Sequence, residues 1–140
     1  MDHHDGMDRA EIEAWGRHLA APGWRQVAEY LDRIFDPRYV VAKLVQSKEP
    51  RGIRLYPAAA AGRKDPSATH LWATRKLWRA DIHVPWETAR AHLPAGRERR
   101  QDEINQDYVE VDLSEPDTVD LAVHLTRLAL AHRELHKTNG

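Results

Sequence analysis

The amino-acid sequence predicts a single α+β domain, in which two N-terminal helices and a long C-terminal helix cover a largely antiparallel sheet of four to five strands. Three observations predict this fold class. The chain has 140 residues, the size of one typical domain. Apolar residues recur at helical spacing near both ends, and β-branched or alternating runs fill the middle. We place the domain in residues 8–137 and predict a disordered tail in residues 1–7.

The first 35 residues contain two helix patterns. Asp8 and Glu11 have the spacing of a capping box, and apolar residues recur at helical intervals as far as Ala20. The sequence Ala-Pro-Gly at 21–23 ends this segment. A second apolar stripe runs from Trp24 to Phe35, just before an Asp-Pro pair. We therefore expect helices at 8–20 and 24–35.

Strand patterns follow the two helices. YVVAKLVQ at 39–46 and IRLY at 53–56 flank a turn at 49–52, which predicts an antiparallel pair. Residues 57–68 contain two prolines, a glycine and four successive alanines without apolar periodicity. They predict a loop.

The stretch HLWATRKLWRADIHVPW at 70–86 predicts the central hairpin. As one unbroken strand it would bury Lys76, whereas a turn or bulge at residues 75–76 reverses the side-chain alternation. A tight turn and a looser bulge both stay open, because Arg-Lys is poor chemistry for a turn that needs positive φ. The reversed register puts Trp78 in the core, and it puts Trp72 on the opposite face. The core face then holds only Leu71, Ala73, Trp78, Ala80, Ile82 and Val84.

The last third contains one strand and a long helix. A short helix is expected at 85–92, and perfect alternation at 108–113 predicts a half-buried strand. Ser114 and Pro116 are typical of a helix start. The final helix carries a stripe that packs on the sheet or, alternatively, forms a homodimer seam. This stripe contains Leu121, Leu125, Leu128 and Leu135.

Composition restricts the class of function. There is no cysteine, so a metal would need His, Asp or Glu ligands. No apolar run approaches the roughly 18 residues of a membrane span, and the acidic N-terminus is unlike a secretory signal, so we expect a cytoplasmic protein without membrane contact. Phosphate-binding glycine loops, nucleophile elbows and dinucleotide fingerprints are absent from the sequence, which gives catalysis no support and predicts no cofactor.

Charge is segregated along the chain although the net charge is only -1. Residues 1–42 carry five Arg and eight acids, residues 43–100 carry thirteen Lys or Arg and five acids, and residues 101–140 carry three and nine. The basic middle segment predicts either a surface for an anionic partner or ion pairs with the two acidic ends inside the fold. Internal pairing is the simpler interpretation.

The largest candidate site is basic and aromatic. A partly exposed Trp72 beside Arg79 either stacks on a nucleic-acid base or makes a cation–π contact within the protein. The complete set is Trp72, Arg75, Lys76, Arg79, Arg97, Arg99 and Arg100.

A second candidate site needs two strands to be neighbours. Asp81 and His83 share a face with Arg79, and they would meet Glu110 and Asp112 if the strand at 108–113 pairs with theirs. This group suits a divalent metal or an acid–base pair, and the simpler alternative is a lattice of cross-strand salt bridges.

A third candidate site lies near the C-terminus. His132 and His136 are spaced i, i+4, with His124 two turns earlier, which is a weak zinc signal without the glutamate of an HExxH motif. Histidine is also favoured near a helix C-terminus by the helix dipole.

These patterns predict a non-catalytic binding or adaptor module whose basic, Trp-bearing segment contacts nucleic acid or an acidic protein surface. One alternative is a protein-interaction or immunity-type module that acts through the acidic C-terminal third and the final helix. The other is a small metal-dependent hydrolase or nuclease that uses the second candidate site.

Overall fold

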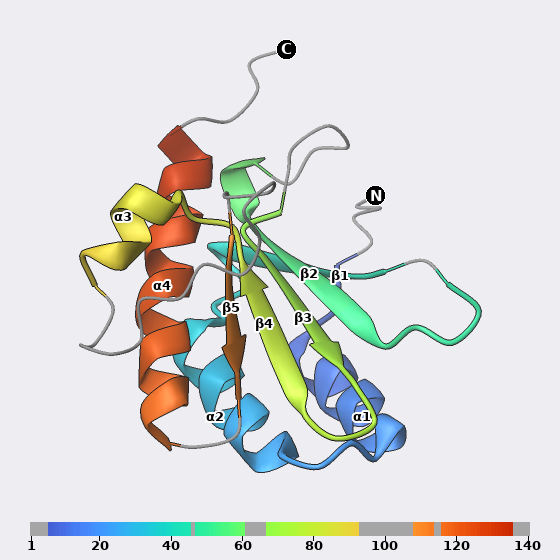
Figure 1. Cartoon of the computed structure of the whole chain (residues 1–140). Helices are drawn as coiled ribbons and strands as arrows, with labels where there is room; N and C mark the ends of the chain where they lie inside the picture. Colours follow the sequence, from blue (N-terminus) through green and yellow to red (C-terminus); the bar gives the residue numbers. More distant parts are fainter. Residues whose placement is uncertain (1–5, 46, 61–66, 93–107, 114–115, 136–140) are drawn as a thin grey trace.

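The predicted fold class is confirmed. The computed structural model describes residues 6–45, 47–60, 67–92, 108–113 and 116–135. Within these ranges four α-helices accompany a five-stranded antiparallel sheet (Figure 1). The strands lie across the sheet in chain order, β1-β2-β3-β4-β5. The helices are α1 (Arg9–Leu19), α2 (Trp24–Ile34), α3 (Trp86–Arg90) and α4 (Pro116–Leu135), and the strands are β1 (Val40–Leu44), β2 (Gly52–Pro57), β3 (Thr69–Ala73), β4 (Trp78–Ile82) and β5 (Val109–Asp112).

The N-terminal helices begin and end where local chemistry dictates. Asp8 caps α1 with a complete capping box: its side chain accepts from the Glu11 N–H, and its own N–H donates to the Glu11 carboxylate. Ala20 then adopts a left-handed conformation with φ 55°, and Gly23, with φ 97°, precedes α2. Both predicted helices are confirmed with small differences at their ends.

The segments around β1 and β2 differ in detail from their predictions. Residue 57, which we expected in a loop, ends β2, and Ala58–Ala60 form a 3-10 turn, while residues 61–66 lie outside the described ranges. Residues 1–5 of the predicted tail also lie outside them. Met7 donates its backbone N–H to the carbonyl of Ala42 in β1 at 2.8 Å.

Of the two alternatives for the hairpin between β3 and β4, a tight turn and a looser bulge, the structure has the tight turn. The Thr74 N–H donates to the Leu77 carbonyl at 2.8 Å, which leaves only residues 75 and 76 in the loop. Neither loop residue has positive φ, so the turn is not of the type for which Arg-Lys would be poor chemistry. The Thr74 hydroxyl accepts from the N–H groups of residues 76 and 77, and this side-chain bonding stabilises a turn that the backbone propensities disfavour. The predicted reversal of side-chain alternation is confirmed, with residues 71, 73, 78, 80, 82 and 84 all buried.

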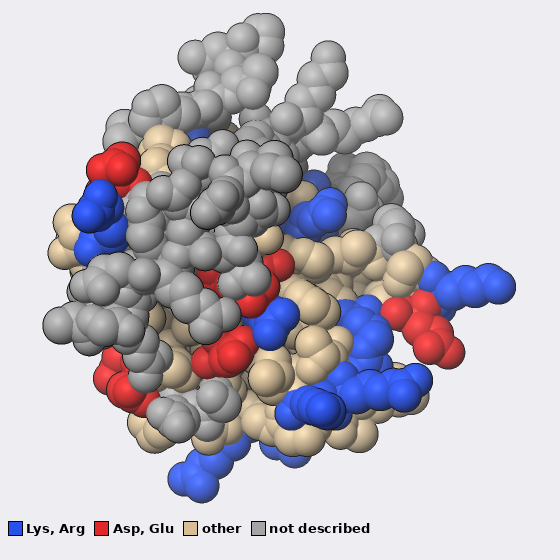
Figure 2. Space-filling view, viewed as in Figure 1, with Lys and Arg blue, Asp and Glu red and all other residues tan. Residues whose placement is uncertain are grey.

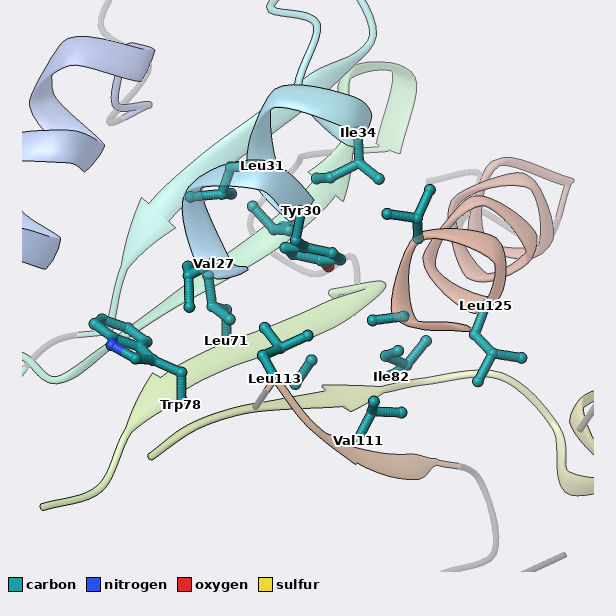
Figure 3. Packing of buried hydrophobic residues seen from close by; sticks show 14 of the residues in the cluster. Val27, Tyr30, Leu31, Ile34, Leu71, Trp78, Ile82, Val111, Leu113 and Leu125 are labelled. Carbon is teal, nitrogen blue, oxygen red and sulfur yellow. The ribbon is translucent and has the colours of Figure 1, made fainter. Parts of the chain in front are cut away.

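The hydrophobic core lies between the helices and one face of the sheet. In Figure 3 the side chains of α2 and α4 project toward those of the central strands. Trp78 is fully buried, and its ring lies 5.4 Å from that of Trp15 and 5.3 Å from that of Trp24. Tyr30 is also fully buried, and its hydroxyl is 2.8 Å from the Thr126 hydroxyl of α4.

Helix α4 packs its apolar stripe into this core. Leu125 is fully buried, and Leu121 and Leu128 pack against the core with part of their surface exposed. This packing is the first of the two alternatives predicted for the stripe. None of the helices described is both long and apolar enough to span a membrane.

Candidate functional site

The second face of the sheet carries polar and aromatic side chains. The described helices α1 and α2 lie behind the strands in the view of Figure 1, on the side of the core. We call the other side the open face. Its residues, as the alternation along the strands defines them, are Val41, Lys43, Arg54, Tyr56, His70, Trp72, Arg79, Asp81, Glu110 and Asp112.

One row of five ionisable residues crosses the whole open face. Lys43 pairs with Arg54, Arg54 with His70, His70 with Asp81, and Asp81 with Glu110, so each strand contributes one member. The row starts with two cations on β1 and β2 and ends with two carboxylates on β4 and β5. The face therefore has a basic half and an acidic half, with His70 between them. We call this row the charge row.

Trp72 is the centre of a network beside the charge row. Its indole N–H donates to Asp81 Oδ2 at 3.0 Å, and the Arg79 guanidinium lies 5.5 Å from the centre of its ring. The His70 ring is inclined by 27° to that of Trp72, with 6.2 Å between the ring centres. The structure thus contains the internal cation–π contact that was one of the two alternatives for Trp72. The indole remains partly exposed.

Arg79 connects this network to the acidic half of the face. Its Nε lies 3.0 Å from Asp112 Oδ1, and its Nη1 lies 3.4 Å from Glu110 Oε2. The Glu110 side chain is 14% exposed and that of Asp112 is 47% exposed. The condition for the second candidate site is met, since β4 and β5 are neighbours. Its residues Glu110 and Asp112 form the cross-strand salt bridges with Arg79 that were the simpler alternative.

Burial perturbs two ionisable groups of the charge row. Burial lowers the pKa of His70 to about 4, and the charge of Arg54 lowers it further, so the imidazole is neutral at neutral pH. Burial raises the pKa of Asp81, against the opposing effect of the Trp72 hydrogen bond. Asp81 Oδ1 is buried and accepts no hydrogen bond, although Oδ2 is bonded to Trp72. The carboxylate is therefore only half satisfied.

Gly52 gives the His70 ring its position. A Cβ at residue 52 would lie 2.6 Å from His70 Nε2 and 3.1 Å from the Trp72 Cβ. The missing side chain lets the imidazole lie over β2. Sequence reasoning treated this glycine only as part of a turn, because the cross-strand pairing of Gly52 with Trp72 cannot be inferred from spacing.

A basic rim borders the open face at the β3–β4 turn. Arg51 donates from Nε to the Ala73 carbonyl at 2.9 Å and from Nη2 to the Thr74 carbonyl at 3.1 Å, which ties the start of β2 to this turn. Arg75 and Lys76 project from the turn and are exposed. We define the basic rim as Arg51, Arg54, Arg75 and Lys76. Figure 2 shows basic side chains gathered toward this end of the strands and acidic ones over β5.

The remaining predicted residues are not brought into one site. His83 Nδ1 lies 3.0 Å from the Ser67 carbonyl oxygen, and its ring meets Tyr108 edge-on. No group of three or more His, Asp or Glu within the described ranges is arranged to hold a metal ion. The predicted anion-binding residues Arg97, Arg99 and Arg100 lie outside the described residues.

The histidines of α4 are arranged differently from the predicted zinc pair. His136 lies outside the described residues, so its pairing with His132 is not tested. His124 Nε2 instead lies 2.9 Å from Nδ1 of His92, which follows α3. The sequence held no signal for this pair, because its members belong to separate elements with no fixed spacing.

Comparisons with known proteins add no relative to this description. No protein-family model, curated protein or solved structure matches the chain.

Proposed function

We propose that this protein is a non-catalytic binding module that holds a single-stranded nucleic acid on its open face and basic rim. One observation carries the proposal: within the described part of the basic middle segment, the cations of the basic rim are not neutralised by ion pairs. Arg79 is paired with carboxylates of β5. The four residues of the basic rim form no ion pair with any described carboxylate.

Acids of the N-terminal segment pair with arginines of the helices and not with the basic rim. Arg9 pairs with Glu13 and Asp32, and Glu13 also pairs with Arg17. Arg33 of α2 pairs with Asp120 of α4. Exposed pairs of this kind contribute about 0–1 kcal/mol each, so they add little to stability, and their relevance to function is the position of the acids that they neutralise. They occupy acids on the helical side, which leaves the positive charge of the rim available to an anionic partner.

Aromatic groups beside the cations favour nucleic acid over other anions. His70 and Trp72 lie between the rim and the acidic half, and Tyr56 lies below the Lys43 ammonium at 5.4 Å. Stacking of a base on an aromatic ring contributes about 1–3 kcal/mol and tolerates any sequence. A partly exposed aromatic group on the face of a sheet suits the unpaired bases of a single strand, because bases in a duplex are stacked on one another.

The test is a titration of tryptophan fluorescence with a mixed-sequence single strand and with a duplex, at low and moderate salt. We expect saturable quenching by the single strand that weakens with salt. Each lost phosphate contact should reduce the salt slope by about 0.7. The variants Arg54→Ala, Arg75→Ala and Lys76→Ala should therefore bind more weakly and with a shallower slope.

The matched control is Arg25→Ala, which removes an exposed cation from α2 on the helical side of the molecule. It should leave binding unchanged apart from a small general effect of net charge. Absence of a saturable signal at both salt concentrations, or an equal loss in Arg25→Ala and the rim variants, would refute the proposal.

The two alternative functions have less support in the described residues. The metal-dependent hydrolase lacks a metal-capable group in that part of the chain, and Arg79 pairs with the Glu110 and Asp112 carboxylates. The interaction module has little apolar surface to use on the described part of α4, where Leu121 and Leu128 pack against the core and are only partly exposed.

A further inference from the structure

The charge row has the same order of chemical groups as a nucleotide. Across three neighbouring strands at one level lie the Arg54 cation, the neutral His70 ring and the Asp81 carboxylate. Neighbouring strands are about 4.8 Å apart, so the outer two members are separated by roughly 10 Å. A nucleotide presents an anionic phosphate, a flat base and, on some bases, a hydrogen-bond donor at the far edge. These three groups match the cation, the ring and the acceptor in turn.

Asp81 is the member of the row that distinguishes one base from another. An ionised carboxylate only accepts hydrogen bonds. Trp72 supplies the donor for Oδ2, and Oδ1 has none. A buried acceptor without a donor is costly, so a ligand that brings a donor to Oδ1 removes that cost.

Bases differ in whether they can supply this donor. Cytosine and adenine carry an exocyclic amino group, and acidic side chains accept from the cytosine amino group in known recognition geometry. Uracil and thymine carry a carbonyl oxygen at the corresponding position, and their one ring N–H lies between two carbonyls that repel a carboxylate. A site built around an unmatched acceptor rejects a ligand without the donor more strongly than an apolar site can.

We infer that the open face selects single strands whose bases carry an exocyclic amino group over those rich in uracil or thymine, and that Asp81 is the residue that determines this specificity. The inference rests on the proposed function and adds its ligand class. Because Oδ1 is buried, the base must displace a neighbouring side chain to reach it. Arg79 and His70 flank Trp72, whose indole is bonded to the same carboxylate.

The experiment compares oligocytidine, oligoadenosine and oligouridine of equal length at neutral pH, with the full chain. The wild-type protein should bind the first two about tenfold more tightly than oligouridine, since one good base contact gives discrimination of this order. In Asp81→Asn the preference should vanish while affinity for oligouridine is kept, because an amide has both a donor and an acceptor and can still accept from Trp72. Unfolding midpoints establish that this variant is folded.

Asp112→Asn is the matched control, because it neutralises a carboxylate on the same face that pairs with Arg79. It should keep the preference. Equal binding of all three strands by the wild type, or a preference that survives in Asp81→Asn, would overturn the inference and leave the proposed function standing. Failure to bind any strand would overturn both.

Discussion

Gly16 offers a sharp test of how the two N-terminal helices pack. In an isolated helix, replacing glycine by alanine stabilises by about 1 kcal/mol. Here a Cβ at residue 16 would lie only 2.1, 2.2 and 2.7 Å from three ring carbons of Trp24. Ordinary contact begins near 3.4 Å, so the ring must retreat by about 1.3 Å. We therefore expect Gly16→Ala to destabilise the protein, against its helix propensity.

The size of the effect follows from what the Trp24 ring contacts. Its N–H donates to the Glu13 carboxylate at 2.6 Å, and its ring lies 5.3 Å from that of Trp78. A hydrogen bond to a charged group contributes about 1.5–3 kcal/mol and an aromatic pair about 0.5–1.5 kcal/mol. Partial loss of both, offset by the propensity gain, gives a net destabilisation of about 1–3 kcal/mol. The Tm should fall by roughly 3–10 °C.

The assay is urea unfolding followed by far-UV circular dichroism, with Ala14→Gly as the reference for propensity at an exposed site of the same helix. In a Trp24→Leu background the clash is gone, so Gly16→Ala should become neutral or stabilising by up to about 1 kcal/mol. A higher unfolding midpoint for Gly16→Ala in the wild-type background would refute the packing argument.

Three further perturbations test the core and the open face. Burial and then Arg54 lower the His70 pKa to about 4, so between pH 6.5 and 4 the unfolded chain binds a proton that the folded chain does not, and stability should fall as the pH drops through this range. The slope is up to about 1.4 kcal/mol per pH unit, or roughly half of that because the ring is partly exposed. His70→Gln should flatten this pH dependence in urea titrations. Thr126→Val removes the 2.8 Å partner of the buried Tyr30 hydroxyl and should lower the free energy of unfolding by about 1–2 kcal/mol, with unchanged stability contradicting the bond. Arg79→Gln removes the ion pairs with Glu110 and Asp112 and should destabilise the protein by about 1 kcal/mol at pH 7, a difference that high salt should reduce.

Local patterns predicted the elements and the faces of the hairpin. A buried face does not tolerate a lysine, and this single requirement placed Trp78 in the core and Trp72 on the opposite face before any strand order was known. The capping box at Asp8 was predicted for a similar reason, because its two hydrogen bonds join residues three apart. Such features depend on a few neighbouring residues, so they can be predicted from the sequence alone.

Contacts between elements distant in the chain were not predictable in the same way. The partners of Arg79 depend on β5 lying next to β4, although a long stretch of sequence separates the two strands. The contact of Gly16 with Trp24 and the pair formed by His92 and His124 depend on how helices dock. Periodicity shows which side of an element is buried, but it carries no information about which other element covers that side.

The order of the strands explains why the open face has two halves. Because β1 to β5 lie side by side in chain order, position along the sequence becomes position across the sheet. The basic middle segment supplies Lys43 and Arg54 on one side, and the acidic C-terminal third supplies Glu110 and Asp112 on the other. A strand order that placed β5 beside β1 or β2 would bring these cations and acids close enough to pair. Among the described strands β4 is the neighbour of β5, and its Arg79 is the described cation of the basic segment that pairs with those acids.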